Sequence, residues 1–231
     1  KGGAFEKEKL QRRIANIELE RDRVEFKLKK IVNSYVTTST QTFSSVKNFF
    51  ELDEQYLDSH EYSVAWIDTT ARSVNIGRGL YFLGEHAKEH PVAYTNKNKS
   101  QKSRNLPVNF PNFALNAFTV KAFNMLYFNT HKNTLGQTLM HYAPFFYPLD
   151  NIENWNRMYG KRGFFQHQCV VPLNNGKEVI TKILKRVSDK GMASFLSVLK
   201  RFGNIPSVGI MSFPREGYTL ALDFPNKGKR T

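Results

Sequence analysis

Cysteine is almost absent from this 231-residue sequence: Cys169 stands alone, which excludes an internal disulfide framework and any cysteine-based metal cluster. The six histidines show no metal-ligand pattern either, and we expect no metal site. His86 and His90 are four residues apart, but the string HAKEH lacks the glutamate placement of zinc peptidases. Glycine-rich phosphate loops of the types GxGxxG and GxxxxGK[ST] do not occur. Any redox chemistry therefore needs a cofactor bound largely by other parts of a protein.

Long hydrophobic runs are missing as well. No stretch of 18 apolar residues exists, so the sequence predicts no membrane-spanning helix, and no signal peptide is recognisable. We expect a cytoplasmic protein or one peripheral to a membrane. The first residue is Lys1 rather than Met, which we interpret as a fragment of a longer protein. A content of 40% hydrophobic and 13% aromatic residues permits a substantial core and excludes wholesale disorder.

Acidic residues are scarce. The chain has 34 basic and 20 acidic side chains, a net charge of +14, and no acidic residue at all between positions 91 and 149. Such a charge favours anionic partners: nucleic acid, an anionic membrane surface or a phosphorylated substrate. The stretch 95–105 has no apolar side chain, so we expect a loop there, which either only keeps the protein soluble or recruits phosphates and lipid headgroups.

One succession of expected elements occurs twice along the chain. Each copy is a strand, a helix with an apolar stripe, and two further strands. The first copy has strands at 33–43, 61–69 and 73–84 and a helix from Ser44 to about Leu57; the second has strands at 164–171, 193–202 and 217–224, a turn at 174–176 and a helix at 177–190. This order predicts an α+β fold, with an antiparallel sheet and helices on one face, built from two strand-helix-strand-strand repeats.

Two further segments fall outside the two copies. Residues 113–130 are expected to form a helix between them. Residues 5–30 are expected to begin as a charged helix. Within 24–32, apolar side chains occur at every second position from Val24 to Leu28, as in a strand. We therefore divide the chain into a remnant or edge element at 1–31 and a main domain at 32–231.

Alternation along the second-copy strands groups several polar side chains. Because successive side chains of a strand point to opposite faces, residues two apart lie together. The groups are Gln166, Gln168 and Val170; Leu196, Val198, Lys200 and Phe202; and Thr219, Ala221 and Asp223. If these faces coincide, the sheet presents amides, a lysine and a carboxylate as a binding pocket; a plain solvated sheet face is the alternative. Cys169 lies opposite the glutamines and is expected to be a packed core thiol.

Four strings in these segments resemble a known family. They are EYSVAWID (61–68), YPLDNIENWNRMYGKRGFFQHQCVVP (147–172), SVLKRFG (197–203) and GYTLALDFP (217–225). Together they resemble the substrate-binding domain of FAD-linked oxidoreductases of the vanillyl-alcohol-oxidase type, most closely the decaprenylphosphoryl-β-D-ribose 2′-oxidase group. The resemblance covers roughly 33–225. It implies that FAD is bound mainly by a separate N-terminal domain, of which 1–31 would be a remnant, and that the sheet covers the flavin ring.

The resemblance also implies roles for individual residues. Gln166 and Gln168 would line the pocket beside the flavin and contact the cofactor, and Lys200 would contact ligands. Lys200 and Gln168 would act in catalysis by orienting oxygens and stabilising a developing alkoxide. The further substrate-binding positions are Val198, Phe202, Phe146, Leu149, Trp66, Thr219 and Ala221. Phe146 stands where the family commonly has an aromatic hydroxyl, and Thr219 and Ala221 stand where mycobacterial relatives often have Asn and Cys.

The function implied is a FAD-dependent oxidation of a secondary alcohol on a sugar or a polyprenyl-phosphate-linked sugar, a bacterial cell-wall polysaccharide precursor. The implied partners are the FAD-binding domain of the same protein, a lipid-linked or small sugar, a short-chain reductase and a membrane surface. On its own the fragment is expected to be colourless and inactive. Two alternatives stand beside this: a non-catalytic basic module that binds nucleic acid or an anionic lipid surface, and a structural interaction domain. No RNP-like string supports the nucleic-acid alternative, so no nucleic acid is expected.

Overall fold

The computed structural model describes residues 10–13, 30–88, 104–131, 136–205 and 215–228. The chain divides into two compact units, residues 1–31 and 32–231. In the first unit, residues 10–13 are helical and exposed. The strand-like stretch expected at 24–32 lies outside the described residues up to position 29, and residues 30–32 are not in a strand. Its origin in a flavin-binding domain stays a prediction.

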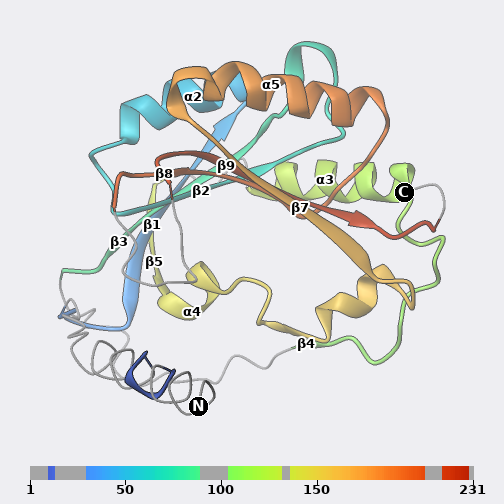
Figure 1. Cartoon of the computed structure of the whole chain (residues 1–231), viewed down its shortest axis with the longest axis horizontal. Coiled ribbons are helices and arrows are strands. Elements are labelled where there is room, and N and C mark those ends of the chain that lie inside the picture. The colour runs from blue at the N-terminus through green and yellow to red at the C-terminus, as the bar shows by residue number, and fades with distance from the viewer. Residues whose placement is uncertain (1–9, 14–29, 89–103, 132–135, 206–214, 229–231) are drawn as a thin grey trace, which may run out of the picture. The chain divides into compact units, whose positions relative to one another are not determined.

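A seven-stranded sheet with the order β5-β1-β3-β2-β8-β9-β7 forms the middle of the second unit (Figure 1). Every ladder of this sheet is antiparallel, which confirms the predicted α+β class. The strands are β1 Tyr35–Phe43, β2 Tyr62–Ile67, β3 Gly79–His86, β5 Gln137–His141, β7 Phe164–Val171, β8 Ser197–Phe202 and β9 Gly217–Pro225. A separate parallel pair joins β4 (Arg104–Asn105) to β6 (Ile152–Glu153); the rest of the expected loop at 95–105 lies outside the described residues.

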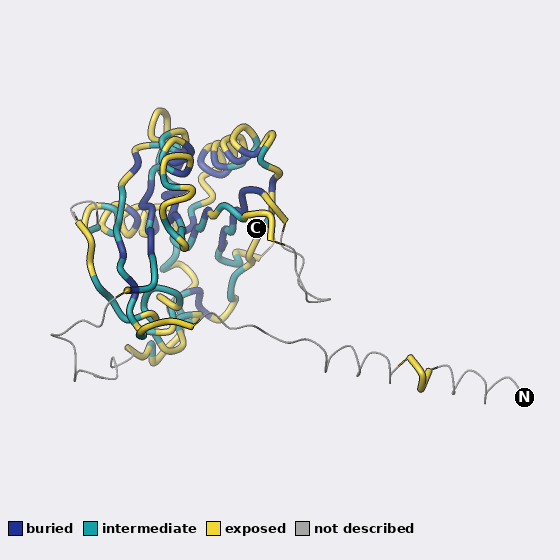
Figure 2. The backbone as a smooth tube through the Cα atoms, turned by 90° about the vertical axis from the view of Figure 1, so that its left-hand side faces the viewer, coloured by how far each residue is buried: buried dark blue, intermediate teal, exposed yellow. Residues whose placement is uncertain are grey.

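Helices α2 (Val46–Tyr56) and α5 (Leu173–Asp189) lie together over one face of the sheet (Figure 1). Their apolar side chains meet those of the strands in one cluster, in which Phe49, Ile180 and Leu220 have no exposed area. Figure 2 shows the buried residues concentrated along the strands and on the helices that cover them. The expected apolar stripe of α5 is therefore the side that packs on the sheet.

Helices α3 (Ala117–His131) and α4 (Tyr142–Phe146) contact the opposite face, α3 through Tyr127 on Trp66 and α4 through Phe146 on Tyr62. Trp66 alternates with Ala65 and Ile67, which belong to the cluster under α2 and α5, so its side chain points the other way. The ring of Trp66 meets that of Tyr127 from α3 at 4.8 Å. The prediction of helices on one face only is therefore wrong for α3 and α4, because a helical pattern does not say which side of a sheet a helix covers.

Local boundaries differ from the predicted ones at three places. Residues 174–176, expected as a turn, belong to the first turn of α5, where a Cβ on Gly176 would come 2.6 Å from the Tyr218 ring. Ser45 rather than Ser44 caps α2. The stretch 73–84 begins with a 3₁₀ turn, Ser73–Asn75, and the strand starts at Gly79. The element orders β1-α2-β2-β3 and β7-α5-β8-β9 follow the expected succession, and the internal repeat stays a prediction.

A buried carboxylate ties α2 to the sheet. Asp53 is 1% exposed and accepts hydrogen bonds from the hydroxyls of Tyr81 (3.0 Å) and Tyr218 (3.1 Å). A guanidinium nitrogen of Arg201 lies 3.4 Å from the same carboxylate. Burial raises the pKa of both tyrosines, so their hydroxyls remain protonated and able to donate. The arrangement supplies the partners that a buried charge requires.

Candidate functional site

The strand register brings most of the predicted site residues onto one face. Directly paired residues of antiparallel strands point to the same side of a sheet. Gln168 pairs with Ala221, Ala221 with Val198, and Val198 with Trp66, which forms a row across β7, β9, β8 and β2. A second row joins Lys200 to Thr219, and Gln166 pairs with Asp223. These residues lie on the face opposite α2 and α5; the roles assigned to them stay predictions.

We call Gln166, Gln168, Lys200, Thr219 and Asp223 the polar face. Gln166, Gln168 and Lys200 are exposed, whereas Thr219 and Asp223 are 3% and 1% exposed. The Gln166 amide Nε2 donates to Asp223 Oδ1 at 2.8 Å, and Gln168 Nε2 makes a longer contact of 3.4 Å with Thr219 Oγ1. Each exposed amide thus contacts a buried polar side chain on the neighbouring strand. Within the described ranges, Lys200 makes no ion pair.

Tyr159, for which the sequence predicted no role, extends the polar face below the surface. Its ring stacks on Phe164 at 4.4 Å and on Phe195 at 5.3 Å. The Tyr159 hydroxyl and Asp223 Oδ2 are both buried without a hydrogen-bond partner among the described residues. Burial raises the pKa of Asp223, and the Gln166 hydrogen bond offsets part of that effect. Burial and the nearby Asp223 charge raise the pKa of Tyr159.

Four predicted residues lie at the margins of this arrangement. Trp66 is 7% exposed beneath Tyr127, and its indole N–H donates to the Phe195 carbonyl at 2.9 Å. Trp66 is therefore covered by α3. Phe202 is half-buried at the end of β8. Phe146 and Leu149, both half-buried, belong to the segment that begins with α4.

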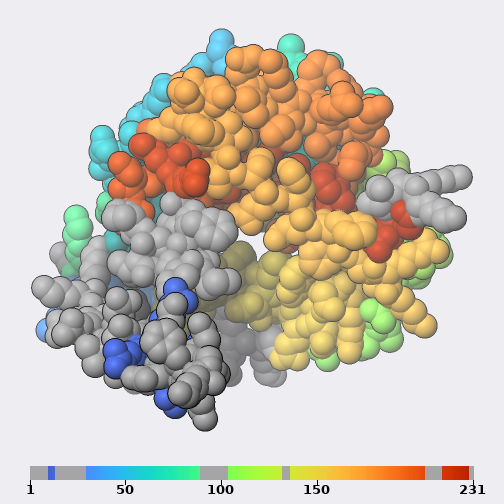
Figure 3. All heavy atoms as spheres, in the orientation of Figure 1, coloured from blue at the N-terminus to red at the C-terminus, as the bar shows by residue number. Residues whose placement is uncertain are grey.

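Phe146 reaches the same sheet face at the other end of β2. Its ring meets that of Tyr62 at 4.9 Å, and Tyr62 shares its side of β2 with Trp66. The neighbouring Phe145 packs directly on Gly84, where a Cβ would come 2.4 Å from its ring. Figure 3 shows an opening in the molecular surface between the atoms of β7 and those of the segment around 142–160. Phe146 therefore lies over the same face of the sheet as the polar face, at β2 rather than at β7 to β9.

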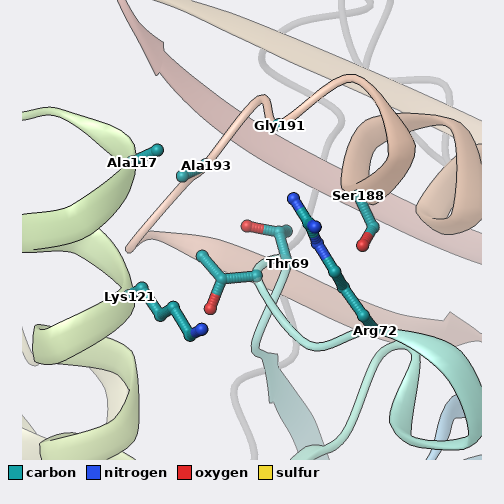
Figure 4. A pocket seen from close by; sticks show the side chains of 8 residues that line it. Thr69, Arg72, Ala117, Lys121, Ser188, Gly191 and Ala193 are labelled. Atoms are coloured by element: carbon teal, nitrogen blue, oxygen red, sulfur yellow. The ribbon is translucent and has the colours of Figure 1, made fainter.

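Two hollows lie elsewhere on the described part of the chain. One, of about 160 Å³, is between the end of β2, α3 and the end of α5 (Figure 4). The other lies between α2 and α5, on the far side of the sheet. The described residues contain no group of three or more histidine, cysteine or acidic side chains able to hold a metal. They also contain no helix long and apolar enough to cross a membrane.

Comparison with known proteins finds relatives over most of the chain. "Decaprenylphosphoryl-beta-D-ribose oxidase" of Mycolicibacterium smegmatis is 32% identical over 178 residues, which cover 73% of this chain and 37% of that protein. "Uncharacterized protein in mprA 5'region" of Streptomyces coelicolor is 24% identical over 175 residues, covering 72% of this chain and 47% of that protein. No protein-family model matches the sequence. The chain thus spans less than half the length of either relative.

Proposed function

This chain is homologous to part of decaprenylphosphoryl-beta-D-ribose oxidase, and from that premise we propose that it is the substrate-binding portion of a FAD-dependent oxidoreductase. The proposed reaction oxidises a secondary alcohol of a sugar, either free or linked to a polyprenyl phosphate. The observation that carries the proposal is the polar face, where two amides and an ammonium group stand exposed on one side of a sheet.

The donors of the polar face fit a flavin and a sugar hydroxyl. The polar edge of a flavin carries carbonyl oxygens and ring nitrogens, which accept hydrogen bonds. Among the described residues, Gln168 has only the 3.4 Å contact with Thr219 and Lys200 makes no ion pair, so both can donate to a ligand. FAD, when bound, supplies the acceptor for the hydride of the carbinol carbon.

The chain's own residues would position and polarise the substrate. Lys200 would place a positive charge beside the substrate oxygen, where it stabilises the negative charge that develops as the hydroxyl proton leaves to solvent and the hydride leaves the carbinol carbon. Gln168 would orient the hydroxyl by hydrogen bonding. Gln166, held through Nε2 by Asp223, would present its remaining amide proton and its carbonyl oxygen in a fixed direction. Phe146 and Phe202 would form apolar walls.

The substrate class and the partners belong to this proposal. The name of the relative indicates that this relative acts on a decaprenylphosphoryl ribose. For this chain we propose a related lipid-linked or free sugar, with Phe146, Thr219 and Ala221 as the positions that adjust the preference. The FAD-binding domain of the same protein and a short-chain reductase are the proposed protein partners.

Turnover by the complete natural protein tests this function. The assay supplies lipid-linked pentoses and a dye that accepts electrons, and it follows dye reduction and the visible absorbance of the protein. We expect dye reduction that depends on the pentose, and bleaching of a flavin band when the dye is left out. A complete protein that contains no flavin, or one that binds nucleic acid with a steep dependence on salt, would contradict the proposal.

A further inference from the structure

Helix α3 is apolar on two sides, although only one of them packs on the domain. Val120 and Asn124 are buried, and Tyr127 covers Trp66. Phe118, Met125 and Leu126 follow at helical spacing on the outer side, where they are 79%, 52% and 64% exposed. A helix that is apolar all round normally has partners on both sides. The outer side of α3 therefore lacks a partner among the described residues.

The cavity of about 160 Å³ opens beside the first turns of this helix, and two cationic side chains from separate elements line it. Figure 4 shows Arg72, from the loop after β2, and Lys121, from α3, at its walls. Neither cation makes an ion pair within the ranges that the structure describes. Lys121 also lies next to Phe118 on the helix surface, since three residues make almost one turn. The cavity and the outer side of α3 are thus adjacent.

The other polar groups around the cavity are already engaged. The hydroxyls of Thr69 and Ser188 donate to backbone carbonyls of Ser194 and Ala71. The Thr70 hydroxyl donates to Asp68 at 2.6 Å, and Asp68 also forms an ion pair of 3.0 Å with Arg78. The two cations are consequently the donors left for an incoming anion.

The end of α5 at the cavity does not require these cations. Helix C-termini attract positive charge through their free carbonyls. Here the carbonyls of Arg186, Val187 and Ser188 accept hydrogen bonds from the backbone N–H groups of the three residues that follow the helix. Capping of α5 thus leaves the positive charge of the cavity available for a ligand.

We propose that the outer side of α3 and the adjacent cavity form a docking surface for an anionic membrane. Phe118, Met125 and Leu126 enter the boundary between headgroups and acyl chains, and Arg72 and Lys121 contact a lipid phosphate. Charge complementarity supports lipid as the occupant, because no acidic residue occurs from position 91 to 149, the segment that contains α3. This inference concerns a surface outside the polar face and does not depend on the proposed oxidation.

Sedimentation of the complete natural protein with lipid vesicles tests the docking surface. Wild type is expected to bind vesicles of phosphatidylglycerol and phosphatidylcholine far more tightly than vesicles of phosphatidylcholine alone. The double variant Phe118→Ser/Met125→Ser should bind at least about tenfold more weakly, because two side chains no longer leave water. Arg72→Gln and Lys121→Gln should each weaken binding to the anionic vesicles by about fivefold.

Matched controls come from the helical layer on the other face. Leu57 is 44% exposed at the end of α2, and Lys47 is exposed on the same helix. Leu57→Ser and Lys47→Gln remove the same kinds of group and should leave vesicle binding within twofold of wild type. A melting curve for each variant establishes that it is folded. If the apolar double variant does not fold, the two charge variants still decide the test, because both side chains are exposed.

Several results would overturn the proposal. One is an absence of vesicle binding. Another is vesicle binding that is equally strong without the anionic lipid and in the variants Arg72→Gln and Lys121→Gln. A dimer that dissociates in Phe118→Ser would assign the surface to a second copy of the chain. An increase in melting temperature with inorganic phosphate alone, lost in Lys121→Gln, would assign the cavity to free phosphate.

Discussion

Gln166 donates a 2.8 Å hydrogen bond from its side-chain Nε2 to Oδ1 of Asp223, the residue directly opposite it in the β7–β9 ladder. Gln166 is exposed, whereas Asp223 is 1% exposed. The buried carboxyl therefore holds an exposed amide in one orientation on the polar face. Asp223 is in this sense a positioning residue for the proposed site, since it acts through Gln166.

Asp223 should make the stability of the fold depend on pH. Burial raises its pKa above the ordinary value of 3.8, so the folded state favours the protonated acid. The stability from this proton is fully present below the unfolded pKa and is lost as pH rises through the folded pKa. We expect Asp223→Asn, which cannot ionise, to gain stability relative to wild type as pH increases from 3.8 upward. Urea unfolding at a series of pH values measures the difference, and a constant or opposite trend would refute the assignment.

Removal of the exposed donors should reduce turnover. In the complete natural protein, Lys200→Ala and Gln168→Ala are each expected to lower kcat by about a hundredfold, because one donor to the developing charge is lost. The melting temperature should change little, since both side chains are exposed. His167→Ala is the matched control, an exposed residue between the two glutamines whose side chain points to the other face. Unchanged turnover in both variants would favour a purely structural role for this sheet.

Loss of a donor to Asp53 should destabilise the core. Tyr218→Phe removes the 3.1 Å hydrogen bond to this buried carboxylate and keeps the ring in place. We expect the free energy of unfolding to fall by about 2 kcal/mol, the usual value for a hydrogen bond to a charged group. Tyr142→Phe, at a tyrosine that is 41% exposed, should change it by less than about 0.5 kcal/mol. Equal effects in chemical denaturation would contradict this account of Asp53.

Gly84 should be required for the position of α4. A Cβ at Gly84 would come 2.4 Å from the ring of Phe145, so Gly84→Ala pushes this ring away from the sheet. The expected loss is about 1–3 kcal/mol in the free energy of unfolding. Gly203→Ala is the control, because a Cβ there meets no atom within 4 Å.

Replacing Phe145 by a residue without a ring should relieve the clash with a Cβ at position 84. In the background Phe145→Ala, Gly84→Ala should cost much less than it does in the wild type, which a double-mutant cycle of unfolding free energies measures. Additive costs would show that the two residues do not press on each other.

Much of the fold could be predicted because it depends on local periodicity. The β7 strand has the predicted bounds at 164–171, and the stripe Ile180, Leu184 and Val187 packs as the helical spacing indicated. Alternation along β7, β8 and β9 also predicted which side chains share a face. These properties are set within single segments, where side chains repeat every two or every 3.6 residues.

Local sequence patterns predicted the wrong structure where contacts with distant segments outweigh local preference. The Asn-Asn-Gly string at 174–176 has the composition of a turn, yet it forms the start of α5, because Gly176 allows the helix to pack closely on Tyr218. The edge strand β5 at 137–141 was not expected, and its only ladder partner among the described residues is β1, about 100 residues earlier in the chain. A strand that forms by pairing with one distant strand has only a weak strand pattern in its own sequence.

The sequence by itself determined the strands and helices of the two expected copies, the excess of positive charge and the groups of side chains that alternate together. Only the tertiary structure decided that β2 pairs with β8, that α3 and α4 cover the face opposite α2 and α5, and that Asp223 holds Gln166 across 57 residues of chain. The physical reason is that alternation is a property of each strand alone. The order of strands and the side on which a helix packs follow from hydrogen bonds and apolar contacts between segments that are distant in the sequence.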